Sequence, residues 1–201
     1  MNKFTRRTVI AAACAAAAMT FAPMSFAQQA PEKKDVTMGV GRKSLYYYLP
    51  LSISEQLGYF KDEGLNVKIV DFQGGSRSLQ AVVGGSADVV SGAFEHTISM
   101  QAKKQPMTAF VLQGRAPQLA LVVSNKTMKD YKQLSDLKGK KVGVTAPGSS
   151  SQMVANFILK KGGLGPKDVA FIGVGSSSGA VSAIRSGQID ALINLDPVIP
   201  I

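Results

Sequence analysis

The feature that most constrains the fold of this chain is a short pattern that occurs twice. Residues 79–90 read LQAVVGGSADVV, and residues 181–192 read VSAIRSGQIDAL. Both segments place apolar residues at helical spacing, then a stop made of small residues, and then an aspartate in front of a short apolar run. Asp88 and Asp190 therefore occupy equivalent positions in two copies of one helix–strand unit.

The similarity continues upstream of both copies. Residues 35–41 parallel residues 140–148, and residues 63–76 parallel residues 162–177. Each half is predicted to run strand, helix, strand, helix, strand, with glycine-containing turns between the elements. Internal repetition of a strand–helix unit indicates two α/β lobes. A cleft between two lobes is a common binding site for a small ligand.

Periodicity and turn residues locate the individual elements. The crossover between the two halves is expected at residues 114–118. Helices are predicted over residues 51–57, 94–104 and 180–185, and two more begin at the turns 74–76 and 147–151. Strands are predicted over residues 36–40, 66–72, 88–91, 107–113, 119–124, 141–145, 169–174 and 190–193.

The first 27 residues have the pattern of a cleavable signal peptide. A basic start precedes the apolar run 9–21, and Ser25-Phe26-Ala27 fits the small-x-small cleavage rule. The sequence therefore predicts export to the periplasm and a mature chain that begins at Gln28. The segment TRRTVI fits a twin-arginine signal as well as a Sec signal, so both routes stay open. The single cysteine, Cys14, lies inside the signal, so no disulfide and no thiolate metal site are expected in the mature chain.

The residues offer little for catalysis. The formal net charge of +10 is dispersed in lysine pairs without interleaved aromatic residues, which argues against nucleic acid as a partner. His96 is the only histidine, and an exposed or packed role is expected for it. Asp88 and Asp190 are expected to close turns by accepting local N–H groups. The glycine-rich segment 173–179 is weak evidence for a nucleotide, and no cofactor or metal is expected.

Four glycine- or serine-rich loops share one position in the predicted fold. They are residues 41–44, 74–76, 149–151 and 176–178, and each follows the carboxyl end of a strand and precedes a helix. Ligands of α/β sheets bind at this edge. Helix N-termini offer free N–H groups and partial positive charge, which favour an anion.

Five phrases in order along the chain resemble the solute-binding proteins of ABC importers, in the nitrate/sulfonate/taurine-type group. They lie at residues 55–70, 84–92, 136–151, 162–169 and 186–192. The resemblance implies a two-lobed periplasmic-binding-protein fold of the type II-like class, with lobes at 28–117 and 118–201. It implies a monomeric protein that is not an enzyme, traps a small organic anion and delivers it to an inner-membrane ABC permease.

The resemblance also implies that residues in the strand-end loops of this chain contact the ligand. The candidates are Ser44, Tyr46, Tyr47, Gly75, Ser76, Gly92, Phe94, Glu95, Gln113, Arg115, Ser149, Ser150, Ser151 and Asp196. Members of the group are usually longer, so the first lobe is expected to be incomplete and the chain marginally stable. The alternative hypothesis is an enzyme of the same architecture that acts on a phosphorylated or pyrimidine-like substrate.

Overall fold

The computed structural model describes residues 31–199 of the chain. The predicted signal peptide lies outside the described residues. Within residues 31–199, all helices and strands belong to one compact unit, which begins at Glu32. Within residues 31–199, no helix is both long enough and apolar enough to cross a membrane.

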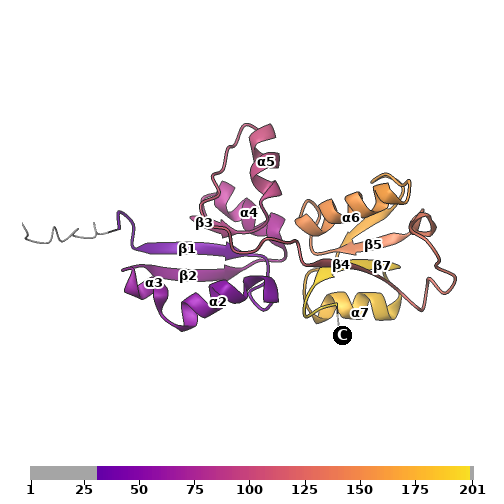
Figure 1. Cartoon of the computed structure of the whole chain (residues 1–201), viewed down its shortest axis with the longest axis horizontal. Helices are drawn as coiled ribbons and strands as arrows, with labels where there is room; N and C mark the ends of the chain where they lie inside the picture. Colours follow the sequence, from indigo (N-terminus) through magenta and orange to yellow (C-terminus); the bar gives the residue numbers. More distant parts are fainter. Residues whose placement is uncertain (1–30, 200–201) are drawn as a thin grey trace, which may run out of the picture. The chain divides into compact units, whose positions relative to one another are not determined.

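The first sheet has three parallel strands in the order β2-β1-β3 (Figure 1). They are β1 (Asp35–Val40), β2 (Asn66–Asp71) and β3 (Val89–Ser91). The short helices η1 (Tyr46–Tyr48), α2 (Leu49–Gln56) and α3 (Tyr59–Asp62) connect β1 to β2. Helix α4 (Gly75–Val83) connects β2 to β3 on the opposite face of the sheet, and α5 (Glu95–Ala102) follows β3.

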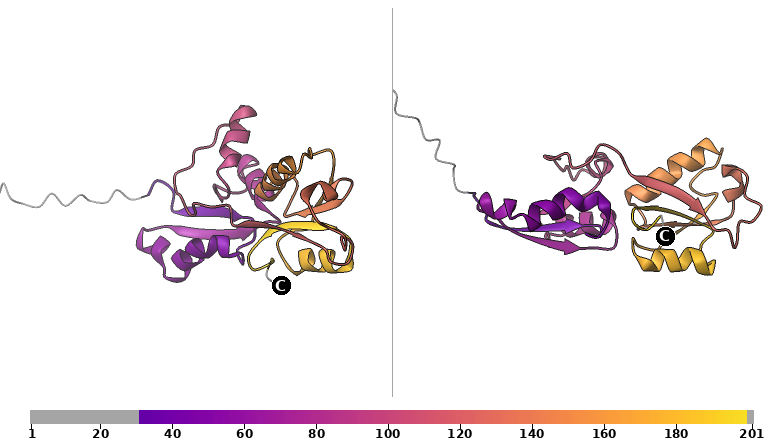
Figure 2. Two further views of the ribbon diagram at one scale, coloured as in Figure 1. Left: turned by 45° about the vertical axis from the view of Figure 1, so that its right-hand side comes forward. Right: turned by 60° about the horizontal axis from the view of Figure 1, so that its bottom comes forward.

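The second sheet repeats this order and adds one strand. Its order is β4-β7-β5-β6, with β4 (Leu119–Val123) antiparallel to β7 (Ala191–Leu195). Strand β5 (Lys141–Val144) lies between β6 (Ala170–Gly173) and β7 and is parallel to both, as β1 is to β2 and β3. Helices α6 (Ser150–Lys161) and α7 (Ser178–Ser186) cover opposite faces of this sheet, and η2 (Leu134–Leu137) precedes β5 (Figure 2). The repeat predicted from the sequence is confirmed by this topology.

Asp88 and Asp190 make the same contact in the two sheets. The Asp88 Oδ2 accepts the Thr37 N–H at 2.8 Å, and the Asp190 Oδ2 accepts the Lys141 N–H at 2.9 Å. In return, the carbonyls of Thr37 and Lys141 accept the N–H groups of Asp88 and Asp190 at 2.8 Å. The expectation of local turn closure is therefore wrong, because the partners are 51 and 49 residues away. Each aspartate instead anchors the start of the central strand.

Strand β7 is the most deeply buried strand. All five of its residues are buried, which explains the near-continuous apolar sequence ALINL. The exception, Asn194, is satisfied because its Nδ2 donates to the Gly175 carbonyl at 2.9 Å. Leu192 and Leu195 of this strand belong to a core cluster that also includes Val40 and Leu45 of the first half.

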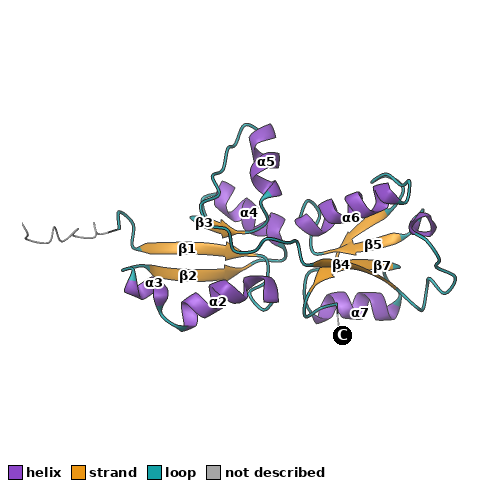
Figure 3. Ribbon diagram, in the orientation of Figure 1, coloured by secondary structure: helices purple, strands orange, loops and turns teal. Residues whose placement is uncertain are grey.

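The strand predicted at residues 107–113 is wrong. This segment is irregular in the structure, and Figure 3 shows it as part of the long loop between α5 and β4. Phe110, Val111 and Leu112 are 73%, 72% and 73% exposed. Their apolar sequence is typical of a strand, but a strand forms only when a neighbour supplies the ladder of hydrogen bonds. Within residues 31–199, no strand pairs with this segment.

Candidate functional site

The loops at the carboxyl ends of the two sheets contact each other. The Ser76 Oγ, at the start of α4, donates to the Pro147 carbonyl, which precedes α6, at 2.9 Å. Gly74 packs so closely that an added Cβ would lie 2.9 Å from the Ala146 Cβ and 3.2 Å from the Thr145 Oγ1. Gly74 also has φ +90°, a conformation that favours glycine. We call residues 74–76, 91–96 and 145–151 the strand-end site.

Three predicted ligand residues come together beside β3. The Tyr47 hydroxyl donates to the Gly92 carbonyl at 3.4 Å, and the Gln113 Nε2 donates to the Tyr47 carbonyl at 2.7 Å. The Ser91 Oγ donates to the Gln113 Oε1 at 2.7 Å. Burial raises the pKa of the Tyr47 phenol, and the nearby Glu95 raises it further. The phenol therefore stays protonated and can donate a hydrogen bond at neutral pH.

His96 is part of the strand-end site and is packed, one of the two roles expected for it from the sequence. Its side chain is only 6% exposed. A Cβ on Gly75 would lie 3.3 Å from the His96 Cε1, and one on Gly92 would lie 3.6 Å from its Nδ1. The ring therefore lies between the loop after β2 and the loop after β3. The sequence signal that points to His96 is its position directly after the predicted contact Glu95, the first residue of α5.

Glu95 and His96 leave polar atoms unsatisfied. Within residues 31–199, the buried Glu95 Oε1 and the two buried ring nitrogens of His96 make no hydrogen bond of normal geometry, although the Gly148 backbone lies close enough to the imidazole to affect its pKa. Burial lowers the pKa of the His96 imidazole, against the opposing effects of the Glu95 carboxylate and the Gly148 backbone. The imidazole is therefore neutral at neutral pH, with one donor and one acceptor nitrogen.

The serines at the start of α6 divide into two groups. The hydroxyls of Ser149 and Ser151 are buried and bond each other at 2.8 Å, and they bond the Thr145 hydroxyl at 2.8 and 2.9 Å. The Ser151 Oγ also accepts the Thr145 N–H at 2.9 Å. These two hydroxyls tie the end of β5 to the start of α6. Ser150 lies between them and is half-buried.

Tyr46 and Asp196 form a separate group. The Tyr46 N–H donates to the Asp196 carbonyl at 3.2 Å, and both residues line a cavity of about 660 Å³. The cavity is open and is also lined by residues 117–120 and by Leu49 and Ile199. The side chains of the remaining candidates, Ser44, Phe94 and Arg115, are exposed and take no part in these contacts.

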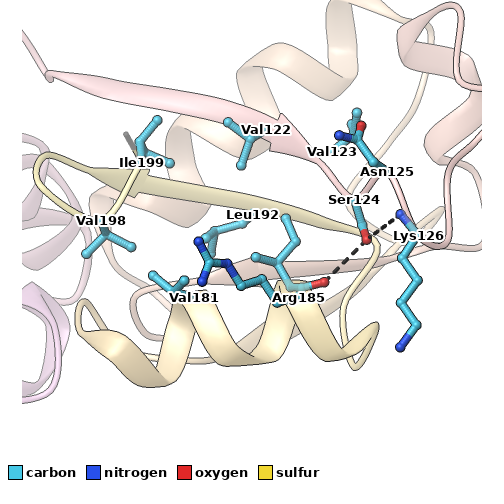
Figure 4. A pocket seen from close by; sticks show the side chains of 11 residues that line it. Val122, Val123, Ser124, Asn125, Lys126, Val181, Arg185, Leu192, Val198 and Ile199 are labelled. Atoms are coloured by element: carbon cyan, nitrogen blue, oxygen red, sulfur yellow. Dashed lines mark hydrogen bonds between the residues drawn. The ribbon is translucent and has the colours of Figure 1, made fainter. Parts of the chain in front are cut away.

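A groove outside the predicted site runs between β4 and α7 (Figure 4). Its volume is about 390 Å³, and none of the predicted ligand residues lines it. Val122, Val181 and Leu192 form an apolar floor, and polar side chains at its rim include Ser124 and Lys126. The Ser124 Oγ donates to the Ile184 carbonyl and accepts the Lys126 N–H, both at 3.3 Å.

The described residues contain no obvious metal site. Within residues 31–199, no three histidine, cysteine or carboxylate side chains are grouped so that they could hold a metal ion. One cationic side chain near the strand ends, Lys43, is paired with a carboxylate, because its Nζ contacts Glu55. The chemistry available at the strand-end site is therefore hydrogen bonding from hydroxyls, backbone groups, Glu95 and His96.

Comparison with protein families and curated proteins gives matches across most of the chain. Residues 46–198 match the family model described as NMT1/THI5 like. The 4-amino-5-hydroxymethyl-2-methylpyrimidine phosphate synthase of Schizosaccharomyces pombe is 28% identical over 75% of this chain and 42% of its own length. YtlA, a provisionally named binding protein of Bacillus subtilis, is 27% identical over 70% of this chain and 42% of its length. The chain thus spans less than half of the length of these relatives.

Solved structures with the same fold include several binding proteins. A structure from Bordetella bronchiseptica RB50 is 64% identical, with a TM-score of 0.81 over 83% of this chain and 52% of that one. The alkanesulfonate-binding protein SsuA of Xanthomonas axonopodis is 22% identical, with a TM-score of 0.60 over 84% of this chain and 56% of that one. The periplasmic nitrate-binding protein NrtA of Synechocystis is 19% identical, with a TM-score of 0.61 over 84% and 48% of the two chains. The similarity to SsuA and NrtA shows the fold and confirms the predicted two-lobed periplasmic-binding-protein fold.

Proposed function

The chain belongs to the NMT1/THI5-like family, and we propose that it acts as the substrate-binding component of an ABC import system. In this role it captures a small organic anion (sulfonate-, nitrate- or carboxylate-like) and delivers it to an inner-membrane permease. We further propose that a cleavable signal peptide, residues 1–27, directs a monomeric protein to the periplasm. The proposed lobes are residues 28–117 and 118–201.

The observation that carries this proposal is the contact between the strand-end loops of two sheets with one topology. Ser76 at the start of α4 bonds Pro147, just before the start of α6. Both helices have eight or more residues, and the N-terminus of such a helix favours a negative charge. A ligand between these starts would touch both halves of the chain, which is the requirement for a protein that closes on its ligand.

A thermal-shift panel tests the proposal on the mature chain. Nitrate, short alkanesulfonates and short carboxylates are added in turn, and isothermal titration calorimetry follows any ligand that raises the melting temperature. A ligand at a hundred times its Kd stabilises the folded state by about 2.7 kcal/mol, so a specific binder is easily seen. If every compound leaves both the melting temperature and the calorimetric baseline unchanged, the chain is not a receptor for this class.

A second candidate function is catalysis on a pyrimidine-like substrate. Its support is the name of the S. pombe relative, a pyrimidine phosphate synthase, together with the buried His96 at the strand-end site. Mass spectrometry separates the two functions. A binding protein returns its ligand unchanged after prolonged incubation, whereas an enzyme converts it in amounts that exceed the protein.

A further inference from the structure

The two sheets differ at one equivalent edge. Strands β3 and β7 occupy the same place, since each follows an anchoring aspartate and pairs in parallel with the central strand of its sheet. The outer side of β7 is covered by the antiparallel strand β4. Within residues 31–199, the outer side of β3 has no partner strand. The Asp190 carbonyl accepts the Ser124 N–H at 2.8 Å, whereas the equivalent Asp88 carbonyl accepts no backbone N–H from the described chain.

Burial and composition indicate that the edge of β3 is suited to a partner. All five residues of β7 are buried, whereas the three residues of β3 are only half-buried. Solvent-facing edge strands are protected by short length, lysine, proline or other charge. Strand β3 is short, but residues 89–94 read VVSGAF and contain no proline and no charge. Phe94, at the end of this segment, is 67% exposed.

The loop after α5 lies beside this edge (Figure 3). The Ser91 Oγ donates to the Gln113 Oε1, and the Gln113 Nε2 donates to the Tyr47 carbonyl, both at 2.7 Å. These two bonds hold the end of the segment 107–113 next to β3. The segment has an uncharged, strand-like sequence, MTAFVLQ, and three of its apolar side chains are 72–73% exposed. A strand placed between β3 and this segment would give both of them a neighbour.

We propose that the outer edge of β3 is a docking site for another polypeptide, which adds an extended apolar segment to the first sheet as an antiparallel strand. The unpaired N–H and C=O groups of an edge strand bind such a segment. The inference goes beyond the proposed function and does not rest on it. The chain's own segment 107–113 is not the expected occupant, because the single-helix connection through α5 favours a parallel strand. A second copy is not expected either, since Gln113 anchors this segment in its own chain.

The second sheet predicts the register of the docked strand. In β4, Leu121 lies opposite Ile193 of β7. Counted from the equivalent aspartates, Ile193 corresponds to Ser91 of β3. A docked segment with the sequence of β4 should therefore place its own Leu121 opposite Ser91. A synthetic peptide with the sequence of residues 117–125, PQLALVVSN, supplies such a segment.

A binding experiment tests the docking site with this peptide. The labelled peptide is titrated into the mature chain and followed by fluorescence anisotropy. The control peptide carries Val122→Pro, which removes an N–H from the middle of the strand. We expect the unchanged peptide to bind at least about tenfold more tightly than the control. Its binding should also slow hydrogen exchange in residues 88–91 and 107–113.

Variants of the chain test whether residues 107–113 form the other side of the docking site. The double variant Phe110→Pro and Val111→Pro removes two successive N–H groups, which point to opposite sides of a strand. We expect it to bind the peptide at least about fivefold more weakly, and unchanged affinity would contradict a strand between β3 and this segment. Phe110→Tyr with Val111→Thr keeps both N–H groups and should bind like the unmutated chain. Both positions are exposed and irregular, and thermal melts verify that the variants are folded.

Cross-linking tests the register. The mature chain has no cysteine, so Ser91→Cys introduces a single thiol. Peptides that carry Leu121→Cys or Val123→Cys are incubated with this variant under mild oxidation. Directly opposed strand residues have Cβ atoms about 4.5–5.5 Å apart, close to the spacing in a disulfide. We expect the Leu121→Cys peptide to cross-link at least about fivefold faster, and equal rates would contradict the antiparallel register.

The remaining outcomes decide between the occupants. Equal binding of the unchanged and control peptides overturns the proposal, and so does binding that leaves exchange in residues 88–91 unchanged. Analytical ultracentrifugation of the chain without peptide tests self-association. A dimer in which residues 88–91 are already protected would assign the edge to a second copy and also overturn the proposal. Ligand capture is measured separately by the thermal-shift panel, so failure here leaves the proposed function untouched.

Discussion

At the scale of single residues, the two equivalent aspartates act as structural anchors. The pKa of the Asp88 carboxyl is lowered by the Lys33 side chain and the Thr37 N–H. Burial opposes ionisation of Asp190, but hydrogen bonds from the Lys141 N–H and the Thr127 side chain lower its pKa below the ordinary 3.8. Asp190→Ala leaves the Lys141 N–H without its acceptor. We expect the free energy of unfolding to fall by about 1 kcal/mol at neutral pH, a value reduced for partial exposure.

The effect of Asp190→Ala should depend on pH in a known direction. A carboxyl with a lowered pKa in the folded state stabilises the fold fully above its ordinary value of 3.8, and this stabilisation is lost as the pH falls through the lowered value. Urea unfolding of the two chains should therefore differ at pH 7 and converge in strong acid. Asp130→Ala, at an exposed turn, should match the unmutated chain at both pH values. A difference that persists unchanged in acid would contradict an ionised role for Asp190.

At the scale of elements, the turn into α4 requires glycine at position 74, because a side chain there fits neither the backbone conformation nor the available space. This residue has φ +90° and ψ 158°, a region open almost only to glycine. Gly74→Ala adds a Cβ at 2.9 Å from that of Ala146, so backbone strain and a clash act together. We expect a loss of about 3 kcal/mol in stability and weaker ligand binding.

Gly85→Ala is the control for this prediction. Gly85 has φ +75° but nothing within 4 Å of an added Cβ, so the variant carries backbone strain alone. Its cost should be about 1 kcal/mol, with no effect on ligand binding. Equal losses of stability in the two variants, measured by urea unfolding, would mean that the contact with Ala146 is unimportant.

The sequence predicted elements well wherever local pattern and tertiary pairing agree. The central strands β1 and β5 follow from their apolar runs, and the repeat around Asp88 and Asp190 places their neighbours. The strand prediction for residues 107–113 was wrong because the apolar pattern is local, whereas a strand also needs a paired neighbour, which depends on how the whole sheet is arranged. In the site, Tyr47 and Gln113 were predicted and do come together. His96 was expected to be exposed or packed, and it is packed; that its neighbours are Gly75 and Gly92 could not be predicted, because they lie 21 and 4 residues away along the chain.

At the scale of the whole molecule, the structure combines two sheets of one topology, whose strand-end loops meet. The core supports this arrangement, since Val40 and Leu45 of the first half pack in one cluster with Leu192 and Leu195 of the second. The hydroxyls of Ser149 and Ser151 are used inside the second half. We therefore propose that backbone N–H groups at the starts of α4 and α6 are among the groups that meet a ligand.

The most direct test of this account is a crystal structure of the mature chain with the compound that gives the largest thermal shift. The account predicts that the ligand lies at the strand-end site, with its anionic group at the starts of α4 and α6 near Ser76 and Ser150. A ligand bound instead in the groove between β4 and α7 would contradict the account.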